Sequence, residues 1–344
     1  APAMQDKTKR SGAAGPLRPA EPRPGSLRRT SDVVLRWRET SILLACIVLA
    51  AYFQFSNPAF LSLSNIKNLI DFTATTAIIG AGEVMVLVCG EVDLSVGMVY
   101  ALVPFIMHFA AQDGLPAGAA IVVALAAAGL VGLINGAITT LLSVPAFVTT
   151  LGAMFLINGL TLTISGGFPI EPQAAAGFAA AFGGNPWARL GWAVAIAIVL
   201  QFVLSRTRFG LHTIATGGNL TAAAEVGIRV NSIKIRNFVL CSVLGGFAGI
   251  IDAFRIGSID PLAGGSEIMF MGIASAVIGG TFLTGGSGTI IGALVGALAL
   301  AILQDGFTLN GVSAFTFDII LGAAILVTMA VNVRLTLWRE RGGG

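Results

Sequence analysis

Two carboxylates, Glu91 and Asp93, lie close together in the segment "GEVDLSVG" (residues 90–97), between two strongly apolar runs. Ionisable side chains in such surroundings are costly and are therefore candidates for function. One chemistry open to them is the binding of a coupling ion, in which Glu83 would take part. The other is structural, because an Asp at this position can accept hydrogen bonds from backbone N–H groups where a new helix begins.

Further ionisable residues fall inside apolar runs. Asp252 and Arg255 are three residues apart on one predicted helix, so they can pair locally. Near the end of that helix, a structural ion pair is the simpler interpretation. The complete set of ionisable candidates is Glu83, Asp252, Arg255, Glu267, Asp305 and Asp318.

Other common chemistries have no support in the sequence. The three cysteines lie in apolar runs without metal-ligand spacing, which indicates small packing residues. His108 and His212 are too few and too far apart in the sequence to indicate a metal site. The segment "GGTFLTGGSGTIIG" (279–292) is rich in glycine but lacks the Gly-Lys-Ser/Thr ending that would hold phosphates. If the protein moves a solute uphill, the energy must come from another chain or from an ion gradient.

The elements that position these residues are membrane-spanning helices. Of the residues, 55% are hydrophobic and 11% charged, and the mean hydropathy is +0.87. About 20 apolar residues cross a bilayer, and a spanning segment is either a helix or part of a closed barrel. Because the runs are continuous rather than alternating, we predict an all-α polytopic membrane protein. About ten spans are predicted, some broken or re-entrant: 41–57, 69–89, 94–111, 117–142, 146–165, 187–204, 235–256, 267–283, 288–305 and 314–333.

The two ends of the chain differ from this membrane domain, which is predicted over residues 40–335. Residues 1–39 carry nine Lys or Arg against four acids and too few apolar residues to fold alone, which indicates a disordered basic tail. Such a tail attracts anionic lipid. It is not expected to be a secretory signal, because the first apolar run begins only near Ser41. Residues 336–344 form a short second tail.

The distribution of positive charge predicts the orientation. Lys and Arg flank the first and last spans and gather between spans six and seven, whereas residues 166–186 contain Glu171 and neither Lys nor Arg. By the positive-inside rule, and with an even number of spans, both termini are predicted to be cytoplasmic. Residues 166–186 are then external. The cytoplasmic loop 206–236 carries Arg206, Arg208, Arg229, Lys234 and Arg236.

The 44 glycines have two expected roles. Small residues let helices approach closely in lipid, and "GALVGALALA" (292–301) carries such a spaced face. Glycines beside polar residues, as in 90–97 and 279–288, are instead typical of broken helices whose backbone lines a cavity.

The longest hydrophilic internal stretch is 206–238. Within it, Asn219 can cap a short helix through "LTAAAEV", and Gly227 suits the left-handed residue that ends a helix. A short helix flanked by basic residues has the form of a docking element. An ordinary amphipathic loop helix is an equally good interpretation of this pattern.

Four segments together resemble the membrane permeases of ribose-type ABC sugar importers. They are "GEVDLSVG", "NGAITTLLSVPAFVTTLGAMFLINGL" (135–160), "IATGGNLTAAAEVGIRVNSIKI" (214–235) and "AVIGGTFLTGGSGTIIGALVGALALAILQDG" (276–306), in this order. The resemblance covers about residues 41–333. It implies a permease of the bacterial inner membrane that works with a second permease subunit, identical or a paralogue. It also implies two ATP-binding cassette domains and a periplasmic solute-binding protein that delivers a monosaccharide or polyol.

The same resemblance implies that this chain has no catalytic residue, metal or cofactor of its own, since ATP and Mg are used by the partner ATPase. No nucleic-acid partner is implied. The loop by which such permeases engage their ATPases has the pattern Glu-Ala-Ala, three residues, Gly. Thr221 departs from the usual acid of this pattern, although Glu225 lies one helical turn away and supplies a charge. The implied ATPase-coupling residues are Asn219, Thr221, Ala222, Ala223, Glu225 and Gly227.

In the first segment the family commonly has Gly where this chain has Glu91, whereas Asp93 belongs to the pattern. Glu91 is thus a variation without an assigned partner. The residues of this broken-helix motif are Gly90, Glu91, Asp93, Ser95 and Gly97.

A path for sugars needs scattered hydrogen-bonding side chains and aromatic faces rather than a charged trap. For each such residue, polar packing between helices is the alternative role. The predicted path residues are Asn135, Phe147, Thr149, Thr150 and Asn158.

Two other functions stay open. One is an ion-coupled secondary transporter, against which the docking-like loop argues. The other is an ABC permease for a different small solute, such as an amino acid, a nucleoside or a signalling furanone.

Overall fold

The computed structural model describes residues 38–313, 316, 319–320, 322–323 and 326–327. The two predicted tails and most of the predicted span 314–333, with Asp318, lie outside the described residues. The described part is helical, and its only β-type pairing is an isolated bridge between Ile170 and Ile259.

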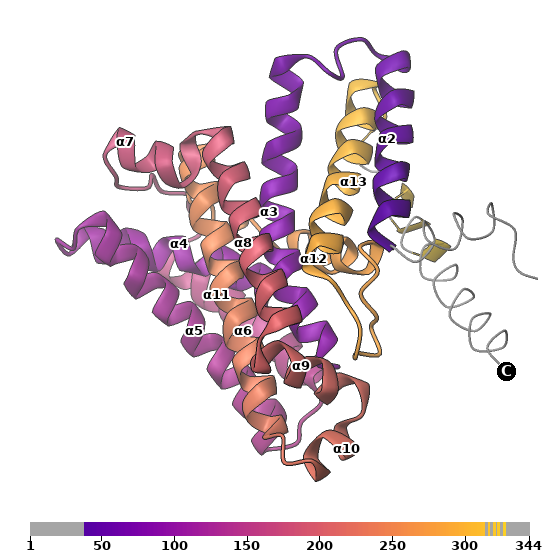
Figure 1. Cartoon of the computed structure of the whole chain (residues 1–344). Coiled ribbons are helices and arrows are strands. Elements are labelled where there is room, and N and C mark those ends of the chain that lie inside the picture. Colours follow the sequence, from indigo (N-terminus) through magenta and orange to yellow (C-terminus); the bar gives the residue numbers. More distant parts are fainter. Residues whose placement is uncertain (1–37, 314–315, 317–318, 321, 324–325, 328–344) are drawn as a thin grey trace, which may run out of the picture. The chain divides into compact units, whose positions relative to one another are not determined.

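Six helices are long and apolar enough to cross a membrane, and three shorter apolar helices accompany them (Figure 1). The long ones are α3 (Leu63–Val88), α5 (Ala117–Leu141), α6 (Ala146–Ser165), α8 (Pro186–Arg206), α11 (Val230–Ile256) and α13 (Ile290–Leu309). The shorter ones are α2 (Arg38–Ser56), α4 (Val96–Gln112) and α12 (Gly265–Ile278). Four short elements lie between these helices: α7 (Ala176–Ala179), the π-helical turn η1 (Ala180–Gly184), α9 (Arg208–Gly218) and α10 (Leu220–Glu225).

The prediction of an all-α polytopic membrane protein is confirmed. Each of the first nine predicted spans corresponds to one of these helices. The prediction 267–283 runs too far, because α12 ends at Ile278 and Gly280 then adopts the left-handed backbone conformation, φ 92°. The prediction 69–89 begins too late, because Ser62 caps α3 by accepting from the N–H of Asn65.

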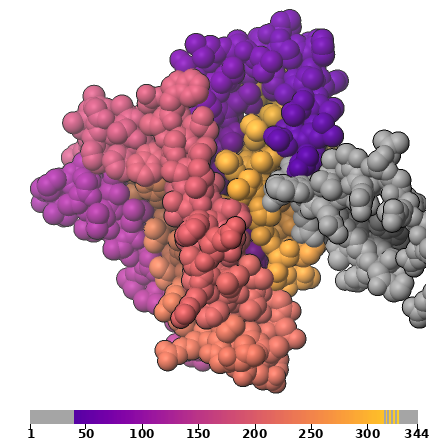
Figure 2. Space-filling model, in the orientation of Figure 1, coloured from indigo at the N-terminus to yellow at the C-terminus, as the bar shows by residue number. Residues whose placement is uncertain are grey.

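Helix α3 lies at the centre of the main core, against α8, α11, α12 and α13. A second core joins α4, α5 and α11. In Figure 2 the yellow α13 is visible between the indigo α2 and α3 and the red α8, all three of which it contacts. Residues of α3 and α11 are therefore mostly buried, whereas large parts of α5, α6 and α8 face outward.

Glycines set several of the helix contacts. A Cβ at Gly292 would overlap the carbonyl oxygen of Gly279, and one at Gly296 would overlap that of Ser275. The predicted close approach along 292–301 is thus confirmed as the packing of α13 on α12. On α5, a Cβ at Gly132 would lie 2.6 Å from Cα of Val239 on α11, so α5 and α11 also touch through their backbones.

The outward surfaces of the helices are apolar. A soluble protein seldom exposes so many large apolar side chains, so these surfaces face lipid. Examples on α5, α6 and α8 are Val122, Phe155, Leu156, Ile198 and Phe202.

The two ends of the bundle are distinguished by the short elements (Figure 1). We call the end that carries α9, α10 and the first residue of α11, Val230, the α10 end. The opposite end carries α7, η1 and the last residue of α11, Ile256, and we call it the α7 end.

Candidate functional site

The broken-helix motif 90–97 is an interruption between α3 and α4. Gly90 has φ 85°, a conformation that glycine adopts without strain. The N–H groups of Gly90 and Glu91 donate to carbonyl groups in the last turn of α3, which closes that helix. Helix α4 begins at Val96 with Ser95 as its N-cap residue. The break therefore leaves only a few residues, with Asp93 among them, outside both helices.

Asp93 is fully buried in this break. Its Oδ1 accepts hydrogen bonds from the Ser95 N–H (2.9 Å) and the Ser95 hydroxyl (2.6 Å). The prediction had the carboxylate bonded to N–H groups of the new helix, but its partner Ser95 is the cap residue just before that helix. The Ser95 hydroxyl also accepts from Nδ2 of Asn135 on α5 (2.8 Å). The break is thus held to α5 by a buried polar chain.

Glu91, left without a partner in the sequence analysis, forms an ion pair with Lys234. Both side chains are largely buried. Lys234 lies in the second turn of α11, close in sequence to α10. The Glu91 side chain, at a position where the family commonly has Gly, therefore joins the break after α3 to the start of α11.

Three turns meet next to this pair at the α10 end. They are residues 88–90 at the end of α3, 217–218 at the end of α9, and 285–286 in the loop between α12 and α13, and we call them the glycine junction. The N–H of Gly286 donates to the carbonyl of Val88 (2.8 Å), which joins two of the three turns directly.

The glycine junction has room only for backbone. A Cβ at Gly217 would overlap the carbonyl oxygen of Val88, and a Cβ at Gly285 would lie 3.0 Å from Cα of Gly90. No side chain separates the turns at these points. The backbone at the end of α9 is therefore in direct contact with the end of α3 and with the loop before α13.

The predicted short helix is present as α10. The Asn219 side chain caps it by accepting from the N–H of Ala222 (3.0 Å), and Gly227 follows it with φ 87°. Both geometric predictions are confirmed. Ala223 is buried against the protein, which fixes the helix in place. The exposed residues of α10 are Leu220, Thr221, Ala222, Ala224 and Glu225.

The predicted path residues differ in how deeply they are buried. Asn135 is buried and bonded to Ser95, as described above. On α6, Thr149 and Thr150 are buried, whereas the Phe147 side chain is 59% exposed. Asn158 is half-buried.

The predicted ionisable residues have varied surroundings. Glu83 is fully buried, and its Oε1 accepts from the Cys241 thiol (3.6 Å). Asp305 on α13 accepts from Nδ2 of Asn65 (2.5 Å). Glu267 is exposed in the first turn of α12. The three cysteines, Cys46, Cys89 and Cys241, are buried, as expected of packing residues.

The predicted local pair of Asp252 and Arg255 is confirmed. It lies near the α7 end of α11. The hydroxyl of Tyr100 on α4 donates to the other oxygen of the Asp252 carboxylate (2.5 Å). This carboxylate therefore joins α4 and α11.

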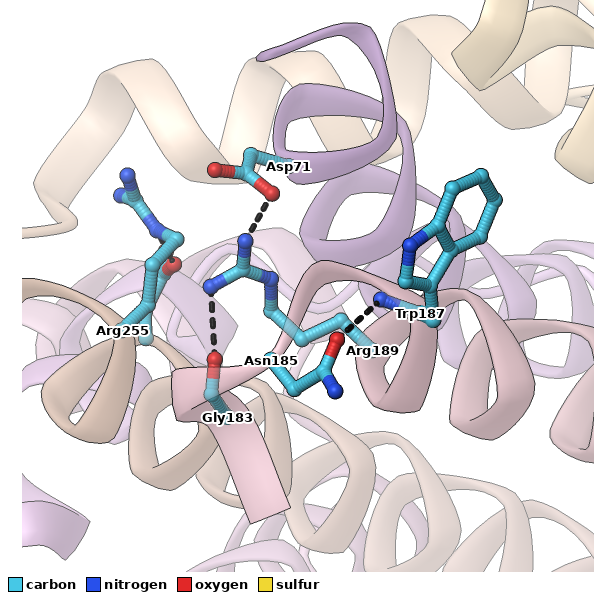
Figure 3. A network of polar contacts seen from close by, with 7 residues as sticks. Asp71, Gly183, Asn185, Trp187, Arg189 and Arg255 are labelled. Carbon is cyan, nitrogen blue, oxygen red and sulfur yellow. Dashed lines mark hydrogen bonds and ion pairs between the residues drawn. The ribbon is translucent and has the colours of Figure 1, made fainter. Parts of the chain in front are cut away.

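A third ion pair, between Arg189 and Asp71, was not predicted from the sequence. Arg189 of α8 is almost fully buried and binds Asp71 of α3 and the carbonyl of Gly183 (2.6 Å) (Figure 3). In the same view, Arg255 lies to the left of the Arg189 guanidinium. The signal was available, because Asp71 and Arg189 are opposite charges near the starts of two apolar runs, and ionisable residues in spans usually pair.

These features define a multi-pass membrane transport protein whose interrupted helices meet the end of α9, next to the exposed short helix α10. Residues 65–329 match the family described as "Branched-chain amino acid transport system / permease component". The chain belongs to this family of permeases, as its resemblance to importer permeases predicted.

Curated relatives cover most of the chain. It is 36% identical over 306 residues to the xylose/arabinose import permease protein XylH of Sulfolobus acidocaldarius, over 87% of this chain and 86% of XylH. It is 35% identical over 308 residues to the ribose import permease protein RbsC of Escherichia coli K12, over 86% of this chain and 93% of RbsC. It is 32% identical over 301 residues to the autoinducer 2 import system permease protein LsrC of Photorhabdus luminescens, over 87% of this chain and 90% of LsrC. No solved structure matches the chain.

Proposed function

We propose that this chain is the membrane-spanning subunit of an ABC importer that carries a monosaccharide or related polyol into the cytoplasm. The relatives named for ribose and for xylose/arabinose support the class of solute. The observation that carries the proposal is α10, a capped and exposed helix connected through the glycine junction to the broken helices. An ion-driven carrier has no need for such a docking element.

The proposed partners are two cytoplasmic ATP-binding cassette domains, a second permease subunit and a periplasmic solute-binding protein. The α10 end would face the cytoplasm and both termini would lie on that side. The support is the positive-inside rule, since that end carries four exposed arginines and the paired Lys234. The exposed arginines are Arg206, Arg208, Arg229 and Arg236.

The coupling step follows from the contacts of α10. ATP binding and hydrolysis in the partner would move α10 as a rigid element. Because α9 leads directly into α10, the movement would reach Gly217 and then the carbonyl of Val88 at the end of α3. The ion pair between Glu91 and Lys234 would make the break after α3 move together with the start of α11. The bundle would thereby alternate between outward-open and inward-open states.

Reconstitution tests the energy source. The chain, its partner ATPase and its binding protein would be placed in proteoliposomes, and uptake of radiolabelled D-ribose, D-xylose and L-arabinose would be measured. We expect uptake that requires ATP and both partners. Uptake by this chain alone, driven by a proton or sodium gradient, would overturn the proposal in favour of a secondary transporter. ATP-driven uptake of another small solute in place of sugars would keep the mechanism and correct the cargo.

A charge exchange tests the coupling step. Glu91→Lys and Lys234→Glu each place two like charges together where solvent screening is weak, which is costly. We expect each single variant to lower ATP-driven uptake severalfold and the double exchange to restore much of it. Arg236→Glu serves as the control, because this exposed arginine is on the same helix. Equal losses in the two single variants and the double variant would refute a coupling role for the pair.

A further inference from the structure

A small pocket opens near the α7 end, between α4, α11 and the segment 257–264 that follows α11. Its volume is about 140 Å³. It shares no residue with the broken-helix motif, the glycine junction or α10. The residues on which the argument rests are Tyr100, Ala101, Asp252, Ile256, Ser258 and Asp260.

The polar centre of the pocket is the Asp252 carboxylate, which is almost fully buried. One of its oxygens binds Arg255 and the other accepts from the Tyr100 hydroxyl. A carboxylate oxygen can accept two hydrogen bonds, so each oxygen keeps an unused acceptor site. The carboxylate is thus a fixed acceptor at the wall of the pocket.

The wall around Tyr100 is rigid. A Cβ at Gly264 would lie 2.7 Å from Cδ1 of the Tyr100 ring, and a Cβ at Gly249 on α11 would overlap the Tyr100 carbonyl. The ring is therefore packed directly against backbone on one side, and the turn of α4 that carries Tyr100 is packed directly against α11. Rigid placement of a donor and an acceptor lowers the cost of binding a ligand.

The segment 257–264 is itself held in place by backbone hydrogen bonds. Ile259 pairs with Ile170 through two backbone hydrogen bonds of 2.7 and 3.0 Å. Ser258 is half-buried and Asp260 is exposed, and both line the pocket. The segment therefore adds polar groups at the mouth without being a loose loop.

The size and charge of the pocket restrict the ligand. Sites for drug-sized ligands begin at roughly 300 Å³, so a cavity of about 140 Å³ takes only a small solute. Arg255 balances the charge of Asp252, so the centre does not select a cation. Hydroxyl groups bind well to a carboxylate, and Ala101 and Ile256 offer apolar walls for the C–H groups of a ring.

On the basis of the function proposed above, we propose that this pocket is a binding site for a single monosaccharide ring on its way into the permease. Vicinal hydroxyls of the sugar donate to the Asp252 carboxylate, and the Tyr100 hydroxyl holds that carboxylate in position. The site includes Ile256, the last residue of α11, and so lies at the α7 end, which is the side from which a binding protein would deliver its solute.

A conservative pair of variants tests the role of Tyr100. Tyr100→Phe removes one hydroxyl from the site, and Tyr52→Phe is the matched control, because Tyr52 is the chain's other tyrosine and is 59% exposed on α2. In proteoliposomes with both partners, we expect Tyr100→Phe to lower the number of sugars moved per ATP by about three- to tenfold, the worth of one buried hydrogen bond. Tyr52→Phe should leave this ratio unchanged. If Tyr100→Phe lowered uptake and ATP hydrolysis in equal proportion, its role would be purely structural and the proposal would fail.

Labelling of a cysteine placed in the pocket separates this inference from the proposed function. The three native cysteines are buried, so a polar maleimide should report on Ser258→Cys with little background. The control is Ser266→Cys, an exposed position that does not line the pocket. Millimolar D-ribose or D-xylose should slow labelling at position 258 and not at position 266.

The other outcomes are equally informative. Protection at position 258 by L-leucine and not by either sugar would overturn the monosaccharide assignment for both the pocket and the proposed function. No protection by any of these solutes, in a transporter that still carries sugar with ATP, would overturn the pocket alone and leave the proposed function intact.

Discussion

Loss of Asp71 should destabilise this protein more than loss of both members of its ion pair. The partner, Arg189, has a side chain that is 2% exposed, whereas that of Asp71 is 20% exposed. Asp71→Ala would leave the arginine charge buried with only the carbonyl of Gly183 as an acceptor. Removal of one partner from a buried ion pair costs about 3–5 kcal/mol. Because the bond to Gly183 remains, we expect the lower end of this range.

The second substitution should recover part of the loss. Arg189→Met replaces the guanidinium by an apolar side chain of similar length, so the double variant contains no buried charge at this position. Replacement of a buried ion pair by apolar residues is often close to neutral. We therefore expect the double variant to be more stable than Asp71→Ala by about 2 kcal/mol.

Unfolding in detergent micelles, followed by tryptophan fluorescence, measures these differences, and Trp192 lies one turn from Arg189 on α8. Asp113→Ala is the control, because Asp113 is an exposed residue between α4 and α5, where substitutions change stability by less than about 0.5 kcal/mol. The reasoning would be refuted by a double variant as unstable as Asp71→Ala, or less stable.

Two further predictions concern the α10 end. Gly217→Ala should abolish ATP-driven uptake or assembly, because its Cβ would overlap the carbonyl oxygen of Val88. Gly218→Ala should be tolerated in the same uptake assay, because its Cβ would lie 3.8 Å from the nearest atom. Asn219→Ala should destabilise α10 by about 1 kcal/mol through loss of its cap, whereas Asn219→Asp keeps the cap. Hydrogen exchange at the N–H of Ala222 should become faster only in the alanine variant. Equal exchange rates in the two variants would contradict this account.

Much of the fold could be predicted from the sequence because the spans are set by composition. Continuous apolar runs predicted the long helices. The turn residues Asn219 and Gly227 predicted the limits of α10, because each acts locally on the backbone. Helix α9 was not predicted. Its sequence, RFGLHTIATGG, mixes polar and apolar residues without a long apolar run.

The partners of charged residues could not be predicted in the same way. Lys234 lies 143 residues from Glu91 in the sequence, and it was grouped with the other positive charges of the loop that set orientation. Asp71 and Arg189 are 118 residues apart, and each is a single charge near the start of an apolar run. Such pairs depend on which helices become neighbours, and the periodicity of one helix does not contain that information.

The glycine junction also limits how this protein can change over generations. Where two side chains touch, a larger residue at one position is compensated by a smaller residue at the other. The neighbour of Gly217 is the carbonyl of Val88, and a carbonyl has no smaller form that a mutation can supply. Revertants of a Gly217 variant, selected for growth on the transported solute, should therefore restore the glycine codon rather than carry a change at position 88.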